Sequence, residues 1–584
     1  MNHQLTGYPS IDKPWLKYYS EDAINASIPQ RTVYENIYEI NSKNLGDVAL
    51  TYFGTRITYR TVFDNVEKVK KAFIANGVKK GDRVIMFTSA TPELIYATLA
   101  LCRIGAIANM INPVFTNEQI IDRINDTEAE VMLVLDQLYG KIQPLLKDLC
   151  VKKTIIIPVC NEMSGITKLV ASIKLKKKID YSKTIIKWWD FIASGKSVGE
   201  VADVEYEKDL PLVMVYSSGT TGASKGIVLT NDGINATISH YLSPDFPYKR
   251  GDKFLQIIPA WFSTGLILST LMPLTLGITV IMEPVYNNEN FAKDIKKYSP
   301  NMTLGSTSQW LYVISSGILD DSDLSGLRYP ITGGEQVLPQ VERLINGFLK
   351  EHNCKSVLLK GYGMCELGST VSTDSMTVRK NGTTGIPIKG VTVSAFDMTT
   401  NKELKYGERG EIRVDSPAHM KEYYKNPEAT NEYFYKDENG TLWGRTGDIG
   451  YVDEEGFVYI LGRATDTFKA EDGEVVYCFD VESQIYKNEN VAQCEVVGLN
   501  VGEYEVPVAH IIMEKNCELT EEQLIKDIHN ICKANLPEHS VPHGYKIIQA
   551  FPIKSSGKRD MELIKQDRKN FLMPVGEEIK IKDI

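Results

Sequence analysis

The 584-residue chain lacks the cysteine patterns that hold metals or build disulfide frameworks. Its nine cysteines are dispersed, and none forms a Cys-x-x-Cys pair or a Cys/His cluster with metal-ligand spacing. An odd, scattered set of this kind is typical of reduced thiols, which predicts a cytoplasmic protein. The first residues, MNHQLTGYPSIDKPW, also lack the apolar core of a signal peptide.

The chain has no excess of basic residues either. With 65 Lys and Arg against 75 Asp and Glu, its formal net charge is -10, whereas nucleic-acid binders carry a basic footprint. We therefore expect no nucleic-acid partner, although a local phosphate pocket is compatible with this charge. Hydrophobic residues make up 43% of the chain, which argues against a mostly disordered protein.

Two segments raise the question of membrane contact. Residues 260–282 carry no charge and are long enough to span a bilayer, but Pro273, Gly277 and several hydroxyl residues favour a buried helix that leads into a core strand. Residues 161–198 contain the basic run IKLKKK and two adjacent tryptophans. Contact with anionic lipid is compatible with that composition, but we favour a solvated helix on an insertion, and expect at most peripheral membrane contact.

Apolar runs alternate with helical patterns through the first two thirds of the chain. We predict buried strands at 82–87, 130–136, 154–159, 212–217, 254–259, 279–283 and 302–306, and helices at 93–106 and 338–352. This alternation predicts parallel sheets covered by helices. After about residue 380 the pattern predicts a small β-rich subdomain, and after Arg463 an α+β domain with a helix opened by Thr520. We place a domain boundary near 464–466.

The strongest chemical signal is YSSGTTGASKGI at 216–227, directly after a predicted strand. Three glycines, four hydroxyl residues and Lys225 lie within ten residues. Glycines let backbone N–H groups approach phosphate oxygens, hydroxyls add donors, and the lysine adds positive charge. The segment is not a Walker A loop, because no glycine directly precedes the lysine. Taken alone, it is also compatible with a mobile Gly-rich loop.

Four later segments accompany this loop: GYGMCEL at 361–367, WGRTGDI at 443–449, YILGR at 459–463 and IKSSGKR at 553–559. In this order the set resembles the superfamily of adenylate-forming enzymes, which includes acyl-CoA synthetases, adenylation domains of nonribosomal peptide synthetases and beetle luciferases. The resemblance implies an α/β fold. It has a large N-terminal domain (1–464) of two α/β sheets plus a small β-barrel (about 380–464), and a smaller, mobile α+β C-terminal domain (465–584).

The resemblance also implies a role for each residue that matches a family motif. The phosphates of ATP would be held by Ser217, Ser218, Gly219, Thr220, Thr221, Gly222 and Lys225. The adenine and α-phosphate side would be lined by Gly334, Glu335, Gly361, Tyr362, Gly363 and Cys365, with Tyr362 stacked on adenine. Asp448 would contact the ribose hydroxyls, and Arg463 would contact the ribose or a phosphate. Glu366 would hold Mg²⁺ with Thr220 nearby. Lys558 would reach the reacting carboxylate.

The implied reaction uses ATP and Mg²⁺ to activate a carboxylic acid as an acyl-adenylate, and then coenzyme A as the acceptor. Lys558, Lys225 and Glu366 are the expected catalytic residues, because positioning and charge neutralisation dominate phosphoryl chemistry of this kind. Closure of the C-terminal domain would keep water from the labile adenylate.

Some positions depart from the family pattern. Ser224 stands where proline is usual, Cys365 where threonine is usual, and Thr465 where Asp or Lys is usual. Cys478 replaces a proline in the loop that lines the thiol tunnel, to which Gly473 also belongs. The departures at Thr465 and Cys478 leave the identity of the thiol acceptor more open than the assignment of the adenylation step.

The acyl pocket is expected at Trp261, Phe262, Leu266, Gly333 and Gly363. Phe262 stands where amino-acid-activating relatives carry an aspartate, so an ammonium group would be left unpaired. Gly363 stands where acetate-specific relatives carry tryptophan. We therefore expect a medium- or longer-chain fatty acid or an aromatic acid, although Trp261 and Phe262 are also compatible with ordinary core packing.

Two alternatives remain beside the acyl-CoA ligase. A stand-alone adenylating enzyme would load a carrier-protein phosphopantetheine thiol instead of CoA. A catalytically weak family member would act as a binding or regulatory protein, but the retention of all the charged motif residues argues against it. The identity of the acid, the acceptor and the oligomeric state are left open by the sequence.

Overall fold

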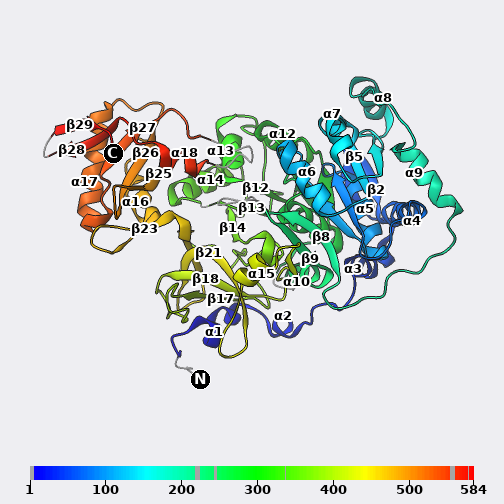
Figure 1. Ribbon diagram of the computed structural model, residues 1–584, viewed down its shortest axis with the longest axis horizontal. Helices are drawn as coiled ribbons and strands as arrows, with labels where there is room; N and C mark the ends of the chain where they lie inside the picture. Colours follow the sequence, from blue (N-terminus) through cyan, green and yellow to red (C-terminus); the bar gives the residue numbers. More distant parts are fainter. Residues whose placement is uncertain (1–4, 218–223, 243–245, 336, 553–558, 576–577) are drawn as a thin grey trace. The chain divides into compact units, whose positions relative to one another are not determined.

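The computed structural model describes residues 5–217, 224–242, 246–335, 337–552, 559–575 and 578–584 (Figure 1). Two compact units divide the chain. The first comprises Met1–Ser394, Arg413–Arg445 and Val452–Val458, and the second comprises Ala395–Ile412, Thr446–Tyr451 and Tyr459–Ile584. Each unit is described by itself below.

A nine-stranded sheet forms one half of the first unit. Its order is β16-β15-β14-β13-β12-β10-β11-β1-β2, and the strands from β14 to β1 run parallel. The bounds are β1 Val48–Tyr52, β2 Thr55–Thr58, β10 Lys253–Gln256, β11 Thr279–Met282, β12 Met302–Gly305, β13 Tyr329–Gly333, β14 Leu359–Tyr362, β15 Ser372–Thr373 and β16 Ile386–Pro387.

An eight-stranded sheet forms the other half, in the order β19-β9-β8-β4-β3-β5-β6-β7. The bounds are β3 Arg83–Phe87, β4 Ile107–Met110, β5 Val131–Leu135, β6 Lys153–Ile157, β7 Ile185–Lys187, β8 Pro211–Tyr216, β9 Gly226–Thr230 and β19 Glu422–Tyr423. Every residue of β4 and β5 is buried, as expected where helices cover both faces of a parallel sheet. All seven strands predicted from the sequence are confirmed.

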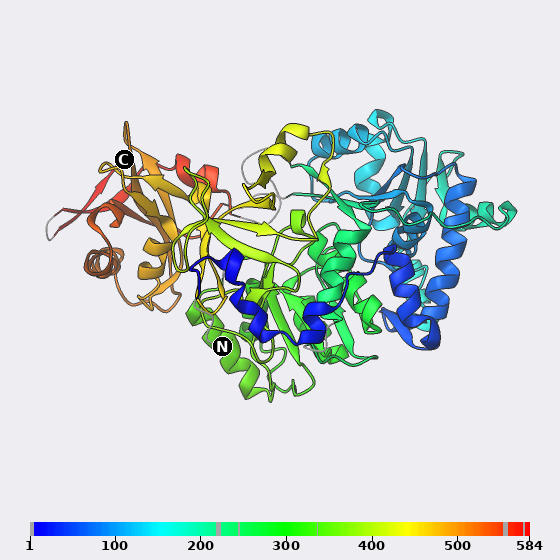
Figure 2. The same ribbon diagram turned by 90° about the horizontal axis from the view of Figure 1, so that it is seen from below.

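Helices surround both sheets of this unit. They are α1 Pro9–Asp12, α2 Glu21–Asn25, α3 Val33–Asn41, α4 Tyr59–Ala75, α5 Pro92–Ile104, α6 Asn117–Asp126, α7 Tyr139–Ile142, α8 Gly165–Lys174, α9 Trp188–Ser194, α10 Asn231–Tyr241, α11 Met272–Leu276, α12 Asn288–Tyr298, α13 Thr307–Ser315, α14 Pro339–Glu351 and α15 Pro427–Tyr433. Figure 2 shows α1 and α2, in dark blue, at the surface of the unit. The predicted helices 93–106 and 338–352 are α5 and α14.

The uncharged stretch 260–282 is a buried helical segment followed by a strand, as predicted. It contains the π-helix Thr264–Leu271, α11 and β11. Within the part of the chain that the structure describes, no helix is both long enough and apolar enough to cross a bilayer.

Five strands of the segment 392–463 belong to one further sheet: β17 Thr392–Phe396, β18 Gly410–Asp415, β20 Phe434–Lys436, β21 Leu442–Val452 and β22 Val458–Arg463. The β-rich character predicted for this segment is confirmed. The whole WGRTGDI motif lies in β21. The strand accommodates Gly447 at a φ of +67°, which is a conformation that favours glycine.

The remainder of the second unit is α+β. Its strands are β23 Thr467–Lys469, β24 Val475–Tyr477, β25 Val491–Asn500, β26 Glu505–Met513, β27 Gly544–Ile547, β28 Phe571–Val575 and β29 Glu578–Lys582, and its helices are α16 Cys478–Ile485, α17 Glu521–Asn535 and α18 Met561–Gln566. A capping box between Thr520 and Gln523 opens α17, as its sequence spacing predicted. This unit has its own core of residues between Phe468 and Leu572.

Glu93 is a buried carboxyl group in the first turn of α5. Its exposed fraction is 1%, and the side-chain amide of Asn161 donates a hydrogen bond of 2.6 Å to its Oε1. Burial, together with the nearby charge of Glu162, raises the pKa of Glu93 from 4.5 to about 8. The group is therefore held largely neutral at pH 7.

We expect Glu93→Gln to stabilise the protein at alkaline pH. Because the pKa is higher in the folded state, the favourable contribution of Glu93 is fully present below about pH 4.5 and is lost as the pH rises towards about 8. The neutral amide keeps an acceptor for Asn161 and should raise the free energy of unfolding above pH 8 on the order of 1–3 kcal/mol. Thermal unfolding of the parent and of Glu93→Gln across this pH range measures the difference in stability. The exposed Glu118, in the first turn of α6, is the matched control. An equal gain in Glu118→Gln would contradict the prediction.

Candidate active site

The predicted phosphate loop is the connection of a β-hairpin. β8 and β9 pair antiparallel up to Tyr216 and Gly226. The N–H of Ser217 donates to the Lys225 carbonyl at 3.1 Å, and the Lys225 N–H donates to Ser217 Oγ at 3.1 Å. Ser224 Oγ donates to the Ser217 carbonyl at 2.5 Å. The departure at Ser224 therefore adds a hydrogen bond that closes the base of the loop, which a proline side chain cannot supply.

Five expected phosphate ligands lie outside the described residues. They are Ser218, Gly219, Thr220, Thr221 and Gly222. Their two neighbours in the motif, Ser217 and Lys225, are described, and they define where the loop leaves and rejoins the sheet.

Tyr423 connects Lys225 to Glu366. It lies in β19, which pairs with β9 and places Tyr423 opposite Ile227. The Lys225 ammonium lies 4.8 Å from the centroid of the Tyr423 ring, within the range of a cation–π contact. The Tyr423 hydroxyl donates a 2.9 Å hydrogen bond to Glu366 Oε1. The structure thus brings both expected catalytic residues of this unit to one tyrosine, Lys225 to its ring and Glu366 to its hydroxyl.

The electrostatics of this group fix its hydrogen-bond direction. Glu366 is buried, with 7% of its surface exposed. Burial, followed by the charge and hydrogen bond of Glu366, raises the pKa of Tyr423 far above its usual value. The phenol therefore keeps its proton and acts as a donor that orients the carboxylate.

The donor set around Glu366 fits Mg²⁺. Mg²⁺ is commonly held by one or two carboxylates together with substrate phosphates, rather than by a complete protein cage. Glu366 offers one such carboxylate beside a hairpin that carries a cation and hydroxyl residues. Among the described residues, no cluster of three or more His, Cys, Asp and Glu side chains could hold a metal by itself.

Glycines of two predicted motifs meet at the ends of neighbouring strands. β13 and β14 run parallel, and Gly333 pairs with Gly361. A Cβ atom on Gly333 would lie 2.9 Å from the Gly361 carbonyl oxygen, so a larger residue would push the strands apart. The following Gly334 adopts a φ of +83°, and Glu335 Oε1 accepts a 2.7 Å hydrogen bond from the Thr307 N–H. Ligands of open α/β sheets bind at such carboxyl ends of strands.

Gly363 has a different reason to be glycine from the one expected. From the sequence, the missing side chain at Gly363 predicts an opening for the acyl group. In the structure, a Cβ atom on Gly363 would lie 1.7 Å from the Ser369 carbonyl oxygen and 2.9 Å from Thr370 Cα. Main chain fills this space, so the expectation that Gly363 opens the pocket is corrected.

We expect Gly363→Ala to impair both folding and activity. Relief of the clash with Ser369 requires the backbone of the GYGMCE segment to move, which should cost about 1–3 kcal/mol of stability and displace Glu366. Urea unfolding and acid-dependent pyrophosphate exchange measure the two effects. Gly347→Ala in α14 is the matched control, because nothing lies within 4 Å of its Cβ position. Equal stability and equal exchange activity in the two variants would contradict this explanation.

The expected acyl residues lie at the start of the π-helix. Trp261 and Phe262 are partly buried, and the Trp261 ring lies 5.7 Å from Tyr286 in an edge-to-face arrangement. Leu266 has no exposed surface and belongs to the main core. This placement leaves Trp261 and Phe262 as the more accessible members of the set.

Two side-chain hydrogen bonds tie the π-helix to the GYGMCE segment. Ser263 Oγ donates to Cys365 Sγ at 3.1 Å, and Ser369 Oγ donates to Thr264 Oγ1 at 3.0 Å. Cys365, which stands where the family usually has threonine, therefore contacts the expected acyl segment. π-Helices are frequent at functional sites, and this one couples the acyl residues to the segment that carries Glu366.

In the second unit, Asp448 and Arg463 form an ion pair. Arg463 Nε lies 3.1 Å from Asp448 Oδ1. The backbone N–H of Asp448 donates to Thr446 Oγ1 at 3.0 Å, and Arg463 Nη1 donates to the Thr446 carbonyl at 3.3 Å. Asp448 is buried whereas the Arg463 side chain is 47% exposed. The arrangement fixes an acidic acceptor of the kind that binds two ribose hydroxyls.

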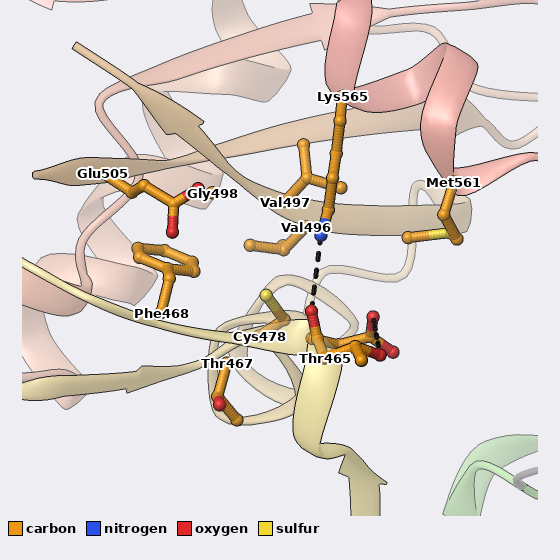
Figure 3. Close-up of a pocket in the computed structure, with 11 residues that line it drawn as sticks. Thr465, Thr467, Phe468, Cys478, Val496, Val497, Gly498, Glu505, Met561 and Lys565 are labelled. Atoms are coloured by element: carbon orange, nitrogen blue, oxygen red, sulfur yellow. Dashed lines mark hydrogen bonds between the residues drawn. The ribbon is translucent and has the colours of Figure 1, made fainter. Parts of the chain in front are cut away.

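Two further departures line one pocket in this unit (Figure 3). Thr465 and Cys478 lie on its wall together with Asp466, Val496 and Lys565. The Lys565 ammonium donates to the Thr465 carbonyl at 3.3 Å. Burial raises the pKa of the Cys478 thiol well above its usual value, so the thiol stays protonated and unreactive at neutral pH.

Of the two residues expected to serve the thiol and the reacting carboxylate, Gly473 is among the described residues and Lys558 is not. Gly473 is in the turn between β23 and β24 at a φ of +83°, and its N–H donates to the Ala470 carbonyl at 3.0 Å. Lys558 lies outside the described residues. The next residue, Arg559, forms an ion pair with Glu495 and lies 4.3 Å from the ring centroid of Phe551.

Sequence reasoning missed Tyr423 and Arg559. Tyr423 lies outside the motifs quoted above, and Arg559 is the last residue of the IKSSGKR segment but had no role assigned to it. Tyr423 becomes recognisable only when β19 is paired with β9. Arg559 could have been noticed as a second cation directly after Lys558, although no sequence signal shows that it contacts Glu495.

Family profiles and curated relatives match most of the chain. The sequence profile described as "AMP-binding enzyme" matches residues 38–424, and the profile of its C-terminal domain matches residues 480–558. A long-chain-fatty-acid–CoA ligase of Bacillus subtilis is 26% identical over 557 residues, covering 94% of this chain and 96% of the relative. A probable 4-coumarate–CoA ligase of Dictyostelium discoideum is 28% identical over 564 residues, covering 95% and 98%.

Solved structures share the fold. An anthranilate CoA ligase in complex with anthranoyl-AMP superposes with a TM-score of 0.78 at 19% identity, covering 92% of this chain and 97% of that one. The ATP-bound MatB of Rhodopseudomonas palustris gives a TM-score of 0.77 at 20% identity, covering 91% and 98%. Because the first profile spans more than half of the sequence, the chain belongs to the AMP-binding enzyme family and so to the adenylate-forming superfamily that its motifs resemble.

Proposed function

We propose that this enzyme activates a carboxylic acid with ATP to an acyl-adenylate and then transfers the acyl group to the thiol of coenzyme A. The observation that carries the proposal is the Lys225–Tyr423–Glu366 arrangement beside the hairpin loop. It joins a phosphate-binding cation to an oriented, buried carboxylate, which is the pair that an ATP–Mg²⁺ site requires. The relatives, which are CoA ligases by name, support the same reaction.

In the first half-reaction, an oxygen of the substrate carboxylate forms a bond to the α-phosphorus of ATP. The bond from that phosphorus to the bridging oxygen breaks, and pyrophosphate leaves. Lys225 neutralises phosphate charge from the hairpin side, and Lys558 approaches the reacting carboxylate. Bound Mg²⁺ would supply further neutralisation of the phosphate oxygens, with Glu366 as its protein ligand and Thr220 nearby. Positioning and charge thus supply most of the catalysis.

Two further groups of residues would bind the nucleoside. Tyr362, Gly334 and Glu335 would bind the adenine, and Asp448, which pairs with Arg463, would accept hydrogen bonds from the ribose hydroxyls. In the second half-reaction the thiolate sulfur forms a bond to the acyl carbonyl carbon, the bond from that carbon to the bridging phosphate oxygen breaks, and AMP leaves with that oxygen. We place the mobile C-terminal domain at 465–584 and the adenylating domain at 1–464, with Gly473 in the loop that lines the thiol tunnel.

The proposed substrate is a medium- or longer-chain fatty acid or an aromatic acid. Trp261 and Phe262 are partly buried and apolar, and they offer no carboxylate to an amino acid's ammonium group. Each methylene buried against such surfaces contributes about 0.8 kcal/mol, so activity should rise with chain length until the pocket ends. The dispersed cysteines, none of which forms a disulfide, support a cytoplasmic location.

A screen of acid-dependent ATP–pyrophosphate exchange, with and without coenzyme A, tests the proposal. Straight-chain acids from acetate upward and hydroxycinnamic acids form the panel, and chromatography detects acyl-CoA. We expect exchange with at least one acid and acyl-CoA formation with the same acid. Exchange without acyl-CoA would favour a carrier-protein thiol as acceptor. A peak at acetate would contradict the assigned pocket, and no exchange at all would contradict the enzyme activity.

A further inference from the structure

Helix α8 is the crossover between two neighbouring parallel strands, β6 and β7, at one edge of the eight-stranded sheet. Figure 1 shows it at the rim of the first unit. In such a β-α-β unit the helix normally packs its apolar side against the sheet. In α8, however, Ala171 is the sole buried residue, and nine of its ten residues are exposed or partly exposed.

The apolar side of α8 faces solvent. Ile166, Leu169, Val170 and Ile173 are 81%, 63%, 43% and 71% exposed. Their spacing of i, i+3, i+4 and i+7 places all four on one face of the helix. Isolated aliphatic side chains on a surface are ordinary, but a contiguous exposed face of this kind marks an interaction site.

Basic residues accompany this apolar face. The segment 166–189 contains seven lysines and a single acidic residue, Asp180, although the whole chain has a net charge of -10. Four of the lysines follow one another closely at the end of the helix, at 174, 176, 177 and 178, and all four are exposed. Trp189, 56% exposed, lies a short distance along the chain, and Trp is enriched at membrane–water interfaces.

We propose that the α8 face, defined as Ile166, Leu169, Val170 and Ile173, docks on the surface of an anionic lipid bilayer, with the lysines at 174–178 at the lipid phosphates. An amphipathic helix with an apolar stripe and adjacent lysines binds in the plane of the interface, and its affinity adds apolar burial to attraction by anionic headgroups. The inference does not depend on which acid the active site takes.

The charge pattern favours an anionic lipid surface, and not a second copy of the chain, as the partner of the α8 face. In a twofold interface the same patch meets itself, so the lysine runs of two copies would be brought close together and would repel each other. An anionic bilayer complements both parts of the patch at once, because it offers negative charge at the surface and apolar chains beneath it.

Vesicle co-sedimentation of the full-length protein tests the proposal. The probes are vesicles of phosphatidylcholine alone and of phosphatidylcholine with phosphatidylglycerol. We expect binding to the second kind only, decreasing with salt. Ile166→Ser combined with Ile173→Ser should weaken it at least about tenfold. Lys176→Ser, Lys177→Ser and Lys178→Ser together should weaken it about 100-fold at low salt.

Ile11→Ser combined with Leu344→Ser is the matched control, since these aliphatic side chains are 64% and 52% exposed on other helices. The control should bind like the parent, and all variants should keep the parent's melting temperature. Failure of the parent to bind, or equal loss in the control, would overturn the proposal. So would a lipid-free parent dimer that becomes a monomer in the Ile166/Ile173 variant, because a second copy would then cover the face.

Discussion

Replacement of Lys558 by alanine is expected to lower the rate of acid adenylation by about 100-fold or more. A positioned cation at the point where charge develops is commonly worth this much, and Lys558 is the residue that the family resemblance places at the reacting carboxylate. Thioester formation from supplied acyl-adenylate should fall much less, because the C-terminal domain rotates between the two half-reactions in the family. Pyrophosphate exchange measures the first half-reaction, and CoA-dependent release of AMP measures the second.

Lys554 provides a matched control for this variant. It lies four residues earlier in the same IKSSGK segment, so Lys554→Ala removes an equal charge from the same segment without removing the motif lysine. We expect its adenylation rate to stay within about threefold of the parent's, because a charge that is not positioned at the reacting atoms contributes little to the rate. If Lys558→Ala slowed both half-reactions equally, the mechanism in which the C-terminal domain rotates between them would be contradicted. If Lys554→Ala slowed adenylation as much as Lys558→Ala does, the effect would come from the loss of net charge and not from the position of Lys558.

The structure shows how the chain is held directly after Lys558. Arg559, which directly follows Lys558, pairs with Glu495, donates to the Cys494 carbonyl at 3.1 Å, and lies over Phe551. Glu495 and Cys494 belong to β25, the edge strand in the order β25-β26-β27-β28-β29, so the chain is anchored to this sheet of the second unit one residue after the lysine. The contacts of Arg559 with Glu495 and Cys494 join residues more than sixty positions apart, and sequence periodicity carries no information about such a pairing.

The parts of the fold that could be predicted are those that local physics determines. The run of β5 is buried on both faces and reads as continuously apolar. The first turn of α17 follows from its capping box, and the end of α5 follows from Gly105 in the left-handed conformation. Each of these signals lies within a few residues of the feature it predicts.

The features that could not be predicted depend on distant backbone. Gly363 is glycine because the Ser369 main chain approaches it, whereas the motif alone suggested an open pocket. Tyr423 reaches Glu366 through the pairing of β19 with β9. The α8 face illustrates the same limit, since helical periodicity identifies an apolar side but not whether any partner covers it.

Glu366 is the residue whose replacement should reveal the metal site most directly. We expect Glu366→Gln to raise the Mg²⁺ concentration needed for half-maximal exchange at least about tenfold, because one anionic ligand of a hard cation is lost. The maximal rate should also fall about 100-fold. The fold should survive, since glutamine keeps the shape and an amide oxygen can still accept from Tyr423. A Mg²⁺ titration of pyrophosphate exchange at saturating ATP measures both effects.

Two companion variants separate metal binding from general damage. Tyr423→Phe removes the donor to Glu366 Oε1 but keeps the ring beneath Lys225, so we expect a shift of the Mg²⁺ titration in the same direction but only about threefold to tenfold. Glu335→Gln changes a carboxylate that accepts from the Thr307 N–H, and it should alter the KM for ATP while leaving the Mg²⁺ midpoint in place. An unchanged Mg²⁺ titration in Glu366→Gln would show that another carboxylate holds the metal, and an equal shift in Glu335→Gln would show that the effect is not specific to the Glu366 site.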